Sequence, residues 1–454
     1  MARDGQSDFG ELYGIDEKPP MGESVLLGIQ HVLAMLLPNI APPLIIAGGI
    51  GLATGQTTFL VQMALLFAGL ATIVQTSPIG PVGARLPIVM GTSFTFVGGL
   101  IAIGTQYGLA TAFGAAIVGA FVEIAIGWKF EWFRSYFTPL VNGLIVVITG
   151  LYLIPTGMDY LAGGADAANY GALINLGVGS LVFVVAILLN QLFSGVLRIL
   201  SLAIAIVGGY VVALAVGMVD LSPIGEAAWV AVPVPLRFGV AFEPVPILIM
   251  GLIYITTTME TVGHISALTT VENRNPNVDE LKGGLLADGV MSTIAGVFGA
   301  FPNTSFAQNI GVITFTGVMS RFVVTIAGVI LVLLGLVPKV GALISTIPYP
   351  VLGGATLVMF GMILSSGFSI LNDDVPINRR NMVIIAAAIS LGLGVTVRPD
   401  VLSQLPQQAQ TFLGNAVVMT AVVALVLDNL VPKRDDTGSV DRDIGRSDPA
   451  ETDD

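Results

Sequence analysis

Long apolar runs follow one another along almost the whole chain, and short polar, proline-rich or glycine-rich breaks separate them. Charged residues make up only 11% of the 454 residues, whereas soluble domains carry about 25%. A membrane-spanning helix needs about 20 predominantly apolar residues, and every backbone polar group in hydrocarbon must be satisfied within the protein. The sequence therefore predicts an all-α polytopic membrane protein.

The boundaries of these runs predict about fourteen transmembrane segments. The segments are expected at residues 24–48, 57–75, 86–104, 108–128, 136–155, 171–193, 197–218, 245–270, 283–300, 303–318, 321–337, 343–366, 380–396 and 410–430. The third and the tenth are short and interrupted by polar residues.

Basic residues in the loops predict the topology. With an even number of spans both termini lie on one side of the membrane, and the loops and span ends on that side hold eleven basic residues against three on the other. The eleven are Arg85, Lys129, Arg134, Arg198, Arg274, Lys282, Arg321, Arg379, Arg380, Lys433 and Arg434, and the three are Arg237, Lys339 and Arg398. Basic residues concentrate in cytoplasmic loops. Both termini are therefore predicted to be cytoplasmic, with the protein in the plasma (inner) membrane.

Both ends of the chain are acidic. Residues 1–22 lack the apolar core of a signal peptide, and residues 1–22 and 433–454 are expected to be solvated cytoplasmic tails. The net charge of −12, with only five lysines, leaves two interpretations open: a halophilic prokaryotic host with a salt-rich cytoplasm, or an ordinary acidic protein.

Two short sequence matches indicate an internal repeat. Thr92-Ser93-Phe94 recurs as Thr304-Ser305-Phe306 at an offset of 212, and a Pro-x-x-x-Gly stretch at 139–143 recurs at 350–354 at an offset of 211. Each repeat then holds seven spans, an odd number, so the halves are inverted relative to each other. Paired interrupted segments mark the binding site in many transporters. Chance similarity among glycine- and serine-rich segments is the alternative.

Two of the predicted spans carry ionisable residues. Glu260 and His264 in span 245–270 lie four residues apart and share one helical face, which is suited to binding a polar ring and carrying a proton. An intramembrane carboxylate is costly unless it faces water, a partner or a ligand. Asp288 in span 283–300 is a candidate proton relay. The alternatives are a carboxylate satisfied by threonine hydroxyls, a hydrogen-bonded core histidine, and a structural acid at a helix interface.

A polar, glycine-containing run occupies the tenth span. Pro302 and the Asn, Thr and Ser that follow disfavour helix, so 303–307 is expected to be extended and 308–318 to be a half-helix that begins within the membrane. The free N–H groups of such a helix start can bind a ligand oxygen. A kinked packing helix is the alternative.

Other site types lack support in the sequence. The chain has no cysteine and two histidines, and it shows no Walker, Rossmann or HExxH pattern and no basic nucleic-acid patch. We therefore expect no enzyme activity, no metal site, no cofactor and no nucleic-acid partner. The roles of His31 and Glu123 stay open, and Asn39 and Asn142 are expected to make interhelical hydrogen bonds.

The chain resembles the nucleobase–ascorbate transporters, also called uracil–xanthine permeases, over roughly residues 22–432. The run from Gln308 to Gly317 has the family pattern Gln/Glu-Asn-x-Gly, four variable residues and Thr. Further matching stretches are Gln30-His31-Val-Leu-Ala-Met35, Met259-Glu260 with Gly263-His264, and Leu286-Ala-Asp-Gly289.

This resemblance implies a fold of fourteen spans in two inverted repeats, with short strands in broken spans 3 and 10 and possible dimers through a gate domain. It implies a core domain at 23–130 (spans 1–4) and 244–338 (spans 8–11), and a gate domain at 131–220 (spans 5–7) and 339–432 (spans 12–14). The acidic tails at 1–22 and 433–454 flank these parts.

The resemblance also implies roles for individual residues. Glu260 and Gln308 would bind the base, with backbone near Ser93 and Phe94, while Asn309 would hold the half-helix. Glu260, His264 and Asp288 are the expected proton-coupling residues. The residues expected to modulate specificity or gating are Gly311, Thr316, Gly317, Gln30 and His31.

The substrate signals conflict. Gln308 matches purine-type members and His264 matches uracil-type members, so we expect a xanthine- or urate-like purine and keep uracil as the alternative. The expected mechanism is import with a proton by elevator-like alternating access, although sodium remains open as the coupling ion. A sulfate- or bicarbonate-type anion transporter of similar architecture, or a channel or membrane-embedded enzyme, are the remaining alternatives.

Overall fold

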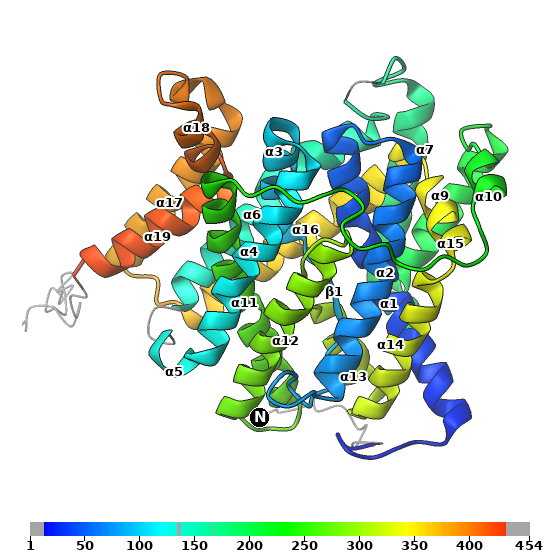
Figure 1. Ribbon diagram of the computed structural model, residues 1–454, viewed down its shortest axis with the longest axis horizontal. Coiled ribbons are helices and arrows are strands. Elements are labelled where there is room, and N and C mark those ends of the chain that lie inside the picture. The colour runs from blue at the N-terminus through cyan, green and yellow to red at the C-terminus, as the bar shows by residue number, and fades with distance from the viewer. Residues whose placement is uncertain (1–12, 134–137, 166, 433–454) are drawn as a thin grey trace, which may run out of the picture.

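The protein is a bundle of long helices around one short pair of strands (Figure 1). The computed structural model describes residues 13–133, 138–165 and 167–432, so the predictions for residues 1–12 and 433–454 lie outside the described residues. Within these described ranges, eight helices are long and apolar enough to cross a membrane, and two bent helix pairs raise this number to as many as ten. The predicted all-α polytopic fold is confirmed.

The first half of the chain contains one broken span between long helices. Its elements are α1 (Met21–Ile50), α2 (Thr54–Thr76), β1 (Met90–Thr92), the 3-10 turn η1 (Phe94–Phe96), α3 (Val97–Tyr107), α4 (Leu109–Trp128), α5 (Phe130–Phe133), α6 (Pro139–Leu161), α7 (Leu173–Leu192), α8 (Val196–Ile199), α9 (Ser201–Ala215) and α10 (Ser222–Glu226).

The second half repeats this order with a second broken span. Its elements are α11 (Pro244–Val271), α12 (Val278–Val297), β2 (Asn303–Ser305), α13 (Ala307–Thr316), α14 (Arg321–Gly335), α15 (Pro338–Ser345), α16 (Tyr349–Asp374), α17 (Arg379–Val397), η3 (Pro399–Leu402), α18 (Gln407–Leu413) and α19 (Ala416–Leu430). All fourteen predicted segments overlap these helices or broken helices, and β1 and β2 lie in segments three and ten as expected.

Some helix boundaries differ from the prediction for local reasons. Helix α12 begins five residues before the predicted 283, because Asn277 and Glu280 form a capping box around its first turn. Helix α16 begins at Tyr349 rather than 343, since α15 and Pro348 precede it. The segment at 321–337 continues from α14 into α15 through an 81° bend, and the last span is split into α18 and α19 by a 76° bend. Pro338 marks the first bend, and Gly414 and Asn415 mark the second.

Helix packing links segments that are distant in sequence. Helix α2 packs along α14, and α4 packs against both α11 and α12. Separately, α16 packs along α6 and α7, while α17 packs along α19. The half-buried ion pair of Arg380 with Asp428 (2.8 Å) joins α17 to α19. The division into core and gate domains stays a prediction.

The two strands lie in the interior and pair antiparallel, with Met90 opposite Ser305 and Thr92 opposite Asn303. Side chains from flanking helices satisfy the backbone around them. Asn39 Oδ1 accepts from Thr92 N at 2.7 Å, and Ser292 Oγ accepts from Asn303 N at 3.0 Å. Asn39 Nδ2 also donates to the Ala64 carbonyl of α2 at 3.3 Å, so the predicted interhelical hydrogen bond of Asn39 is confirmed, and the structure adds its contact with β1.

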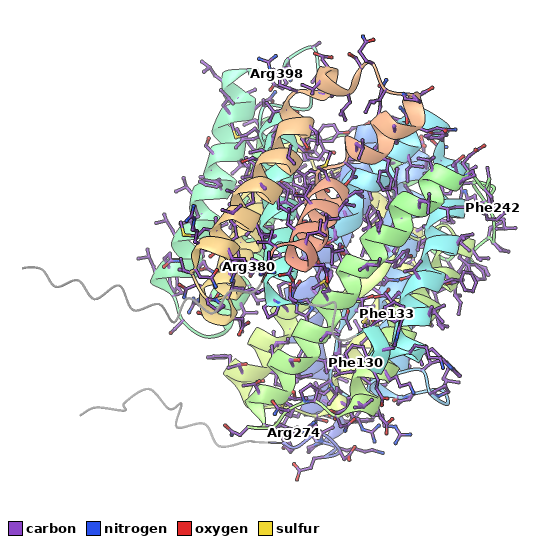
Figure 2. All side chains as sticks on the ribbon, turned by 90° about the vertical axis from the view of Figure 1, so that its left-hand side faces the viewer. Phe130, Phe133, Phe242, Arg274, Arg380 and Arg398 are labelled. Atoms are coloured by element: carbon purple, nitrogen blue, oxygen red, sulfur yellow. The ribbon has the colours of Figure 1, made fainter. Side chains whose placement is uncertain are left out.

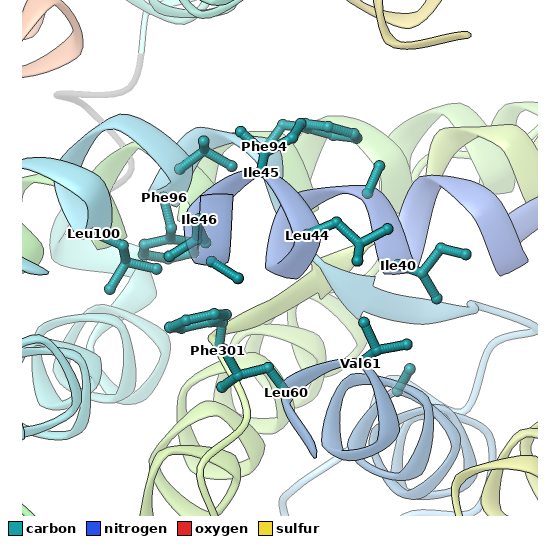
Figure 3. Close-up of a cluster of buried hydrophobic side chains, with 14 of the residues drawn as sticks. Ile40, Leu44, Ile45, Ile46, Leu60, Val61, Phe94, Phe96, Leu100 and Phe301 are labelled. Carbon is teal, nitrogen blue, oxygen red and sulfur yellow. The ribbon is translucent and has the colours of Figure 1, made fainter. Parts of the chain in front are cut away.

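Apolar side chains surround the broken spans. Figure 3 shows Phe94 and Phe96 of η1 and Phe301 ahead of β2, gathered around Ile45 and Ile46 of α1. Aromatic rings bury large apolar areas, so this cluster fixes both broken spans against the same helix.

The segment before α1 is bound rather than wholly solvated. Tyr13 forms a parallel bridge with Val318, and its carbonyl accepts from Met319 N at 2.9 Å. The carboxylate of Asp16 pairs with Arg321 Nε at 2.6 Å. The expectation of a solvated tail is therefore wrong for this segment, which pairs with the residues directly after α13.

Arg274 and Arg398 are two of the basic residues used in the topology prediction. Figure 2 shows Arg398 and Arg274 at opposite ends of the molecule, and the loop charges predict opposite sides of the membrane for these two residues. Arg274 is held by Glu272 and Glu280 at 2.6 and 2.8 Å. The two carboxylates raise the pKa of Arg274 further above its ordinary value.

Candidate functional site

Glu260 lies on α11 beside the first broken span. Its Oε1 accepts a hydrogen bond from Thr95 Oγ1 of η1 at 2.5 Å, and the Ser93 hydroxyl is also within interaction range. The carboxylate is partly exposed and has hydroxyl partners but no cationic partner among the described ion pairs. It is therefore an available acceptor for an N–H group or a proton.

His264 extends the same helical face toward the second broken span. Its Nδ1 lies 2.8 Å from Ser305 Oγ of β2. Helix α11 thus contacts η1 through Glu260 and β2 through His264. The sequence prediction that these two residues share one face is confirmed, and the structure adds that they contact different halves of the repeat.

Asp288 on α12 lies within a hydrogen-bond network behind this face. Its Oδ1 accepts from Gln75 Nε2 at 2.9 Å, and its Oδ2 accepts from the Thr261 hydroxyl. The Gln75 amide is oriented by Ala84 N, which donates to Gln75 Oε1 at 2.9 Å. Thr261 also lies 3.1 Å from the hydroxyl oxygens of both Thr304 and Ser305. A continuous polar chain therefore joins Asp288 to the strand that contacts His264.

The half-helix predicted after the broken backbone is α13. Its N-cap, Phe306, has no side-chain hydrogen bond to the first turn, so first-turn N–H groups remain available there. Gln308 in this turn is exposed, and α13 packs against α11, the helix of Glu260. The prediction of extended backbone followed by a half-helix is confirmed.

Asn309 anchors α13 to α1. Its Nδ2 donates to the His31 carbonyl at 3.1 Å and lies 3.0 Å from His31 Nδ1. Both side chains are buried. His31, whose role was open, therefore forms the α1 half of this contact, and Asn309 has the position expected of a residue that holds the half-helix.

The remaining motif residues have different surroundings. Gly317 ends α13 in the left-handed region (φ 68°), where glycine is favoured, and the Thr316 hydroxyl donates to Val312 O at 2.9 Å. These two residues form the end of the helix. Gly311 is exposed with open space beside it, and Gln30 is half-buried on α1.

One aromatic contact joins the site to α16. The ring of Phe94 meets that of Phe360 edge-on at a centroid distance of 5.7 Å. Phe360 was not predicted, because one phenylalanine in an apolar span carries no distinguishing signal. Gln75, Thr95, Thr261 and Ser305 were also missed, although a polar glutamine inside span 57–75 was a usable signal for the first.

Replacing Asn309 with Ala is expected to lower uptake of the transported compound by about tenfold. The change removes both contacts of Asn309 with α1 and leaves the buried Nδ1 of His31 without its partner, and an unsatisfied buried group costs about 1–3 kcal/mol. Initial uptake rates in membrane vesicles would measure the effect. Thr314→Ala is the matched control, because Thr314 lies on the same helix, is exposed, and bonds only its own turn. Equal rates in the two variants would contradict the anchoring role.

Metal chemistry finds no support in the described part of the chain. Within it, no group of three or more His, Asp or Glu side chains is arranged to hold a metal ion. The side chains around Glu260 offer hydrogen-bond acceptors, hydroxyls and one aromatic ring.

Sequence comparisons agree with this chemistry. The xanthine/uracil permease model, described as "Permease family", matches residues 22–401. The chain is 40% identical over 417 residues to a putative purine permease of Clostridium perfringens, and this alignment covers 92% of each chain. It is 38% identical over 404 residues to the uric acid permease PucK of Bacillus subtilis, and this alignment covers 89% of this chain and 94% of the relative.

Comparison with solved structures supports the fold. The transmembrane domain of the cyanobacterial bicarbonate transporter BicA superposes with a TM-score of 0.58 at 14% identity, covering 89% of this chain and 96% of that domain. At this identity the match concerns architecture alone, whereas the family match and both relatives extend over most of the sequence. The chain therefore belongs to the xanthine/uracil permease family of multi-pass membrane transporters.

Proposed function

We propose that the protein imports a purine nucleobase of the xanthine or urate type together with a proton. The observation that carries the proposal is Glu260, a partly exposed carboxylate between the two broken spans that has hydroxyl partners but no paired cation. Such an acceptor suits the acidic ring N–H groups of an oxidised purine. The names of the purine and uric acid permeases related to the chain support the same substrate class.

Each site residue has a separate task in this proposal. Glu260 accepts ring N–H groups, as charge-assisted hydrogen bonds are among the stronger ones. Gln308 pairs its amide with a neighbouring ring N–H and C=O. Backbone near Ser93 and Phe94 completes the pocket, while Asn309 keeps the start of α13 in place.

Coupling in this proposal uses the proton rather than sodium. A carboxylate without a cationic partner in a low-dielectric site is stabilised when it binds a proton. Glu260 receives that proton, and His264 and Asp288, which Thr261 and Ser305 join to each other, assist its transfer. No cofactor takes part.

Transport in this proposal follows an elevator-like mechanism. The core domain, which carries Glu260 and Gln308, moves against the gate domain formed by α6, α7, α9, α16, α17 and α19. The contact of Phe94 with Phe360 would break and form again during this movement. Two copies associate through the gate domain in the inner membrane, with both termini cytoplasmic.

A substrate panel tests the proposal. Purified protein would be heated with xanthine, urate, hypoxanthine, guanine, adenine or uracil at about pH 5.5 and about pH 8, and uptake of labelled xanthine would be measured alongside. We expect xanthine or urate to raise the melting temperature most, and uptake to be several-fold faster at the lower external pH because the proton is a co-substrate.

Two other results would redirect the assignment. Stabilisation by uracil alone would favour the uracil alternative, for which His264 at the site is the supporting observation. Saturable sulfate or bicarbonate uptake without a nucleobase response would favour an anion transporter.

A further inference from the structure

Glu123 is a buried acid that the proposed function does not use. It lies on α4, has no exposed surface, and faces α11 and α12. A fully buried carboxylate must be paired, hydrogen-bonded or protonated, since burying an unpaired charge is very costly. Its hydrogen bonds and neighbours therefore indicate its protonation state.

The hydrogen-bond geometry at Thr258 indicates that Glu123 is the donor there. Its Oε1 lies 3.3 Å from Thr258 Oγ1, while its Oε2 has no hydrogen-bond partner. The single hydroxyl proton of Thr258 already has a better acceptor, the carbonyl of Tyr254 at 2.8 Å. Thr257 also donates to this carbonyl, at 3.2 Å. The Thr258 oxygen is then free to accept a hydrogen bond from a neutral carboxylic acid.

The charged neighbours of Glu123 are all acidic. Asp288 from α12 and Glu260 from α11 act on it electrostatically, and Tyr254 from α11 is the other titratable side chain nearby. Helices α3 and α5 also pack on α4 and contribute no group that interacts with it. The ion pairs of the described residues lie elsewhere. Three neighbouring carboxylates without a cation cannot all be ionised in a low-dielectric interior.

Hydrogen bonding distinguishes the three acids. Both oxygens of Asp288 accept bonds, from Gln75 and Thr261, which favours its charged form. Glu260 accepts from Thr95 and is partly exposed. Of the three, Glu123 alone has a buried oxygen without a partner, so a proton is most stably held there.

We propose that Glu123 holds a resident proton behind the substrate site. As a neutral acid, Glu123 donates a hydrogen bond to Thr258. It also adds no third negative charge beside Asp288 and Glu260. The proton remains on Glu123 while Glu260 gains and loses its own. The part of the proposal that concerns transport rests on the proposed function, and the part that concerns protonation does not.

The test compares thermal unfolding of wild-type protein and Glu123→Gln without substrate, from about pH 5.5 to about pH 8.5. An unfolded glutamate titrates near pH 4.3, so above that pH the native protein holds one proton more than the unfolded chain. Stability then falls as pH rises, with the unfolding equilibrium constant growing about tenfold per pH unit per proton. Glutamine mimics the neutral acid, so we expect the variant to lose this part of the pH dependence.

Two control variants test whether the changed pH dependence is specific to Glu123 or follows from the loss of any carboxylate. Glu131→Gln removes an exposed acid on α5 and is expected to leave the wild-type pH dependence unchanged. In wild type, Asp288 accepts hydrogen bonds from Gln75 and Thr261. The amide N–H₂ that Asp288→Asn introduces would face one of these two donors, so this variant is expected to have a lower melting temperature at every pH. A Glu123→Gln variant that behaves like Asp288→Asn would overturn the proposal.

Uptake distinguishes this proposal from the proposed function. We expect Glu123→Gln to transport within about twofold of wild type with the same pH profile, as a neutral isostere retains about the same local charge. If Glu123→Gln abolished a sodium dependence seen in wild type, Glu123 would be an ionised cation ligand, which contradicts a resident proton. Failure of nucleobase uptake in wild type would refute the proposed function and leave the melting result intact.

Discussion

Replacing Glu260 with Gln is expected to lower nucleobase uptake by about 100-fold or more while the protein still folds. The change removes the carboxylate that accepts ring N–H groups and the proton. Hydrogen bonds to charged groups contribute about 1.5–3 kcal/mol, and each 1.4 kcal/mol is about a factor of ten in affinity. Loss of the proton site would add to this effect. Initial uptake in vesicles, together with the elution profile of the purified variant, would measure both parts.

The matched control for this variant is Glu243→Gln. Glu243 precedes α11, the helix of Glu260, but is exposed at its N-terminal end. The control is expected to transport like wild type. Wild-type rates and pH dependence in Glu260→Gln would refute the assignment of Glu260 as substrate and proton acceptor.

Replacing Gly353 with Ala is expected to destabilise the packing of α6 on α16 by about 3 kcal/mol or more, at or above the upper end of the usual cost of overpacking. A Cβ at this position would lie 2.0 Å from the backbone nitrogen of Leu161 and 2.5 Å from its Cα. Backbone atoms cannot rotate aside as a side chain can, so the helices must separate. We expect a large fall in the yield of folded protein and in its melting temperature.

Gly361→Ala provides the comparison within the same helix. A Cβ at Gly361 meets nothing within 4 Å, so the added methyl group is expected to be neutral or slightly stabilising. Similar melting curves for the two variants would show that the close approach at Gly353 does not limit stability.

The sequence was sufficient to predict the helices and the two interruptions. Apolar runs long enough for a bilayer specify spans directly, and polar residues after Pro302 specify the break before α13. The sequence contains the capping box of α12, Asn277 with Glu280. The start of this helix was nevertheless predicted too late, because the boundary was placed at the first apolar residues, which follow the charged first turn. The bends at α14–α15 and α18–α19 coincide with Pro338 and with Gly414-Asn415, turn-favouring residues that a hydropathy search does not weigh.

The site was predictable where a residue type is rare in hydrocarbon. Glu260, His264 and Asp288 stand out in apolar spans for this reason. Thr95 and Thr261 did not, because threonine hydroxyls often bond the helix's own backbone and occur in many membrane helices. Only the tertiary structure brings Thr261 to Asp288 and Thr95 to Glu260.

The pairing of β1 with β2 has a consequence for biogenesis. Met90 and its partner Ser305 are 215 residues apart, and ribosomes add about 5–20 residues per second. The first strand therefore waits about 10–40 s for its partner to be synthesised. During that interval the N-terminal half is already in the bilayer with an unpaired strand edge. Nascent chains stalled between residues 92 and 303 are expected to be the species most prone to degradation or chaperone capture.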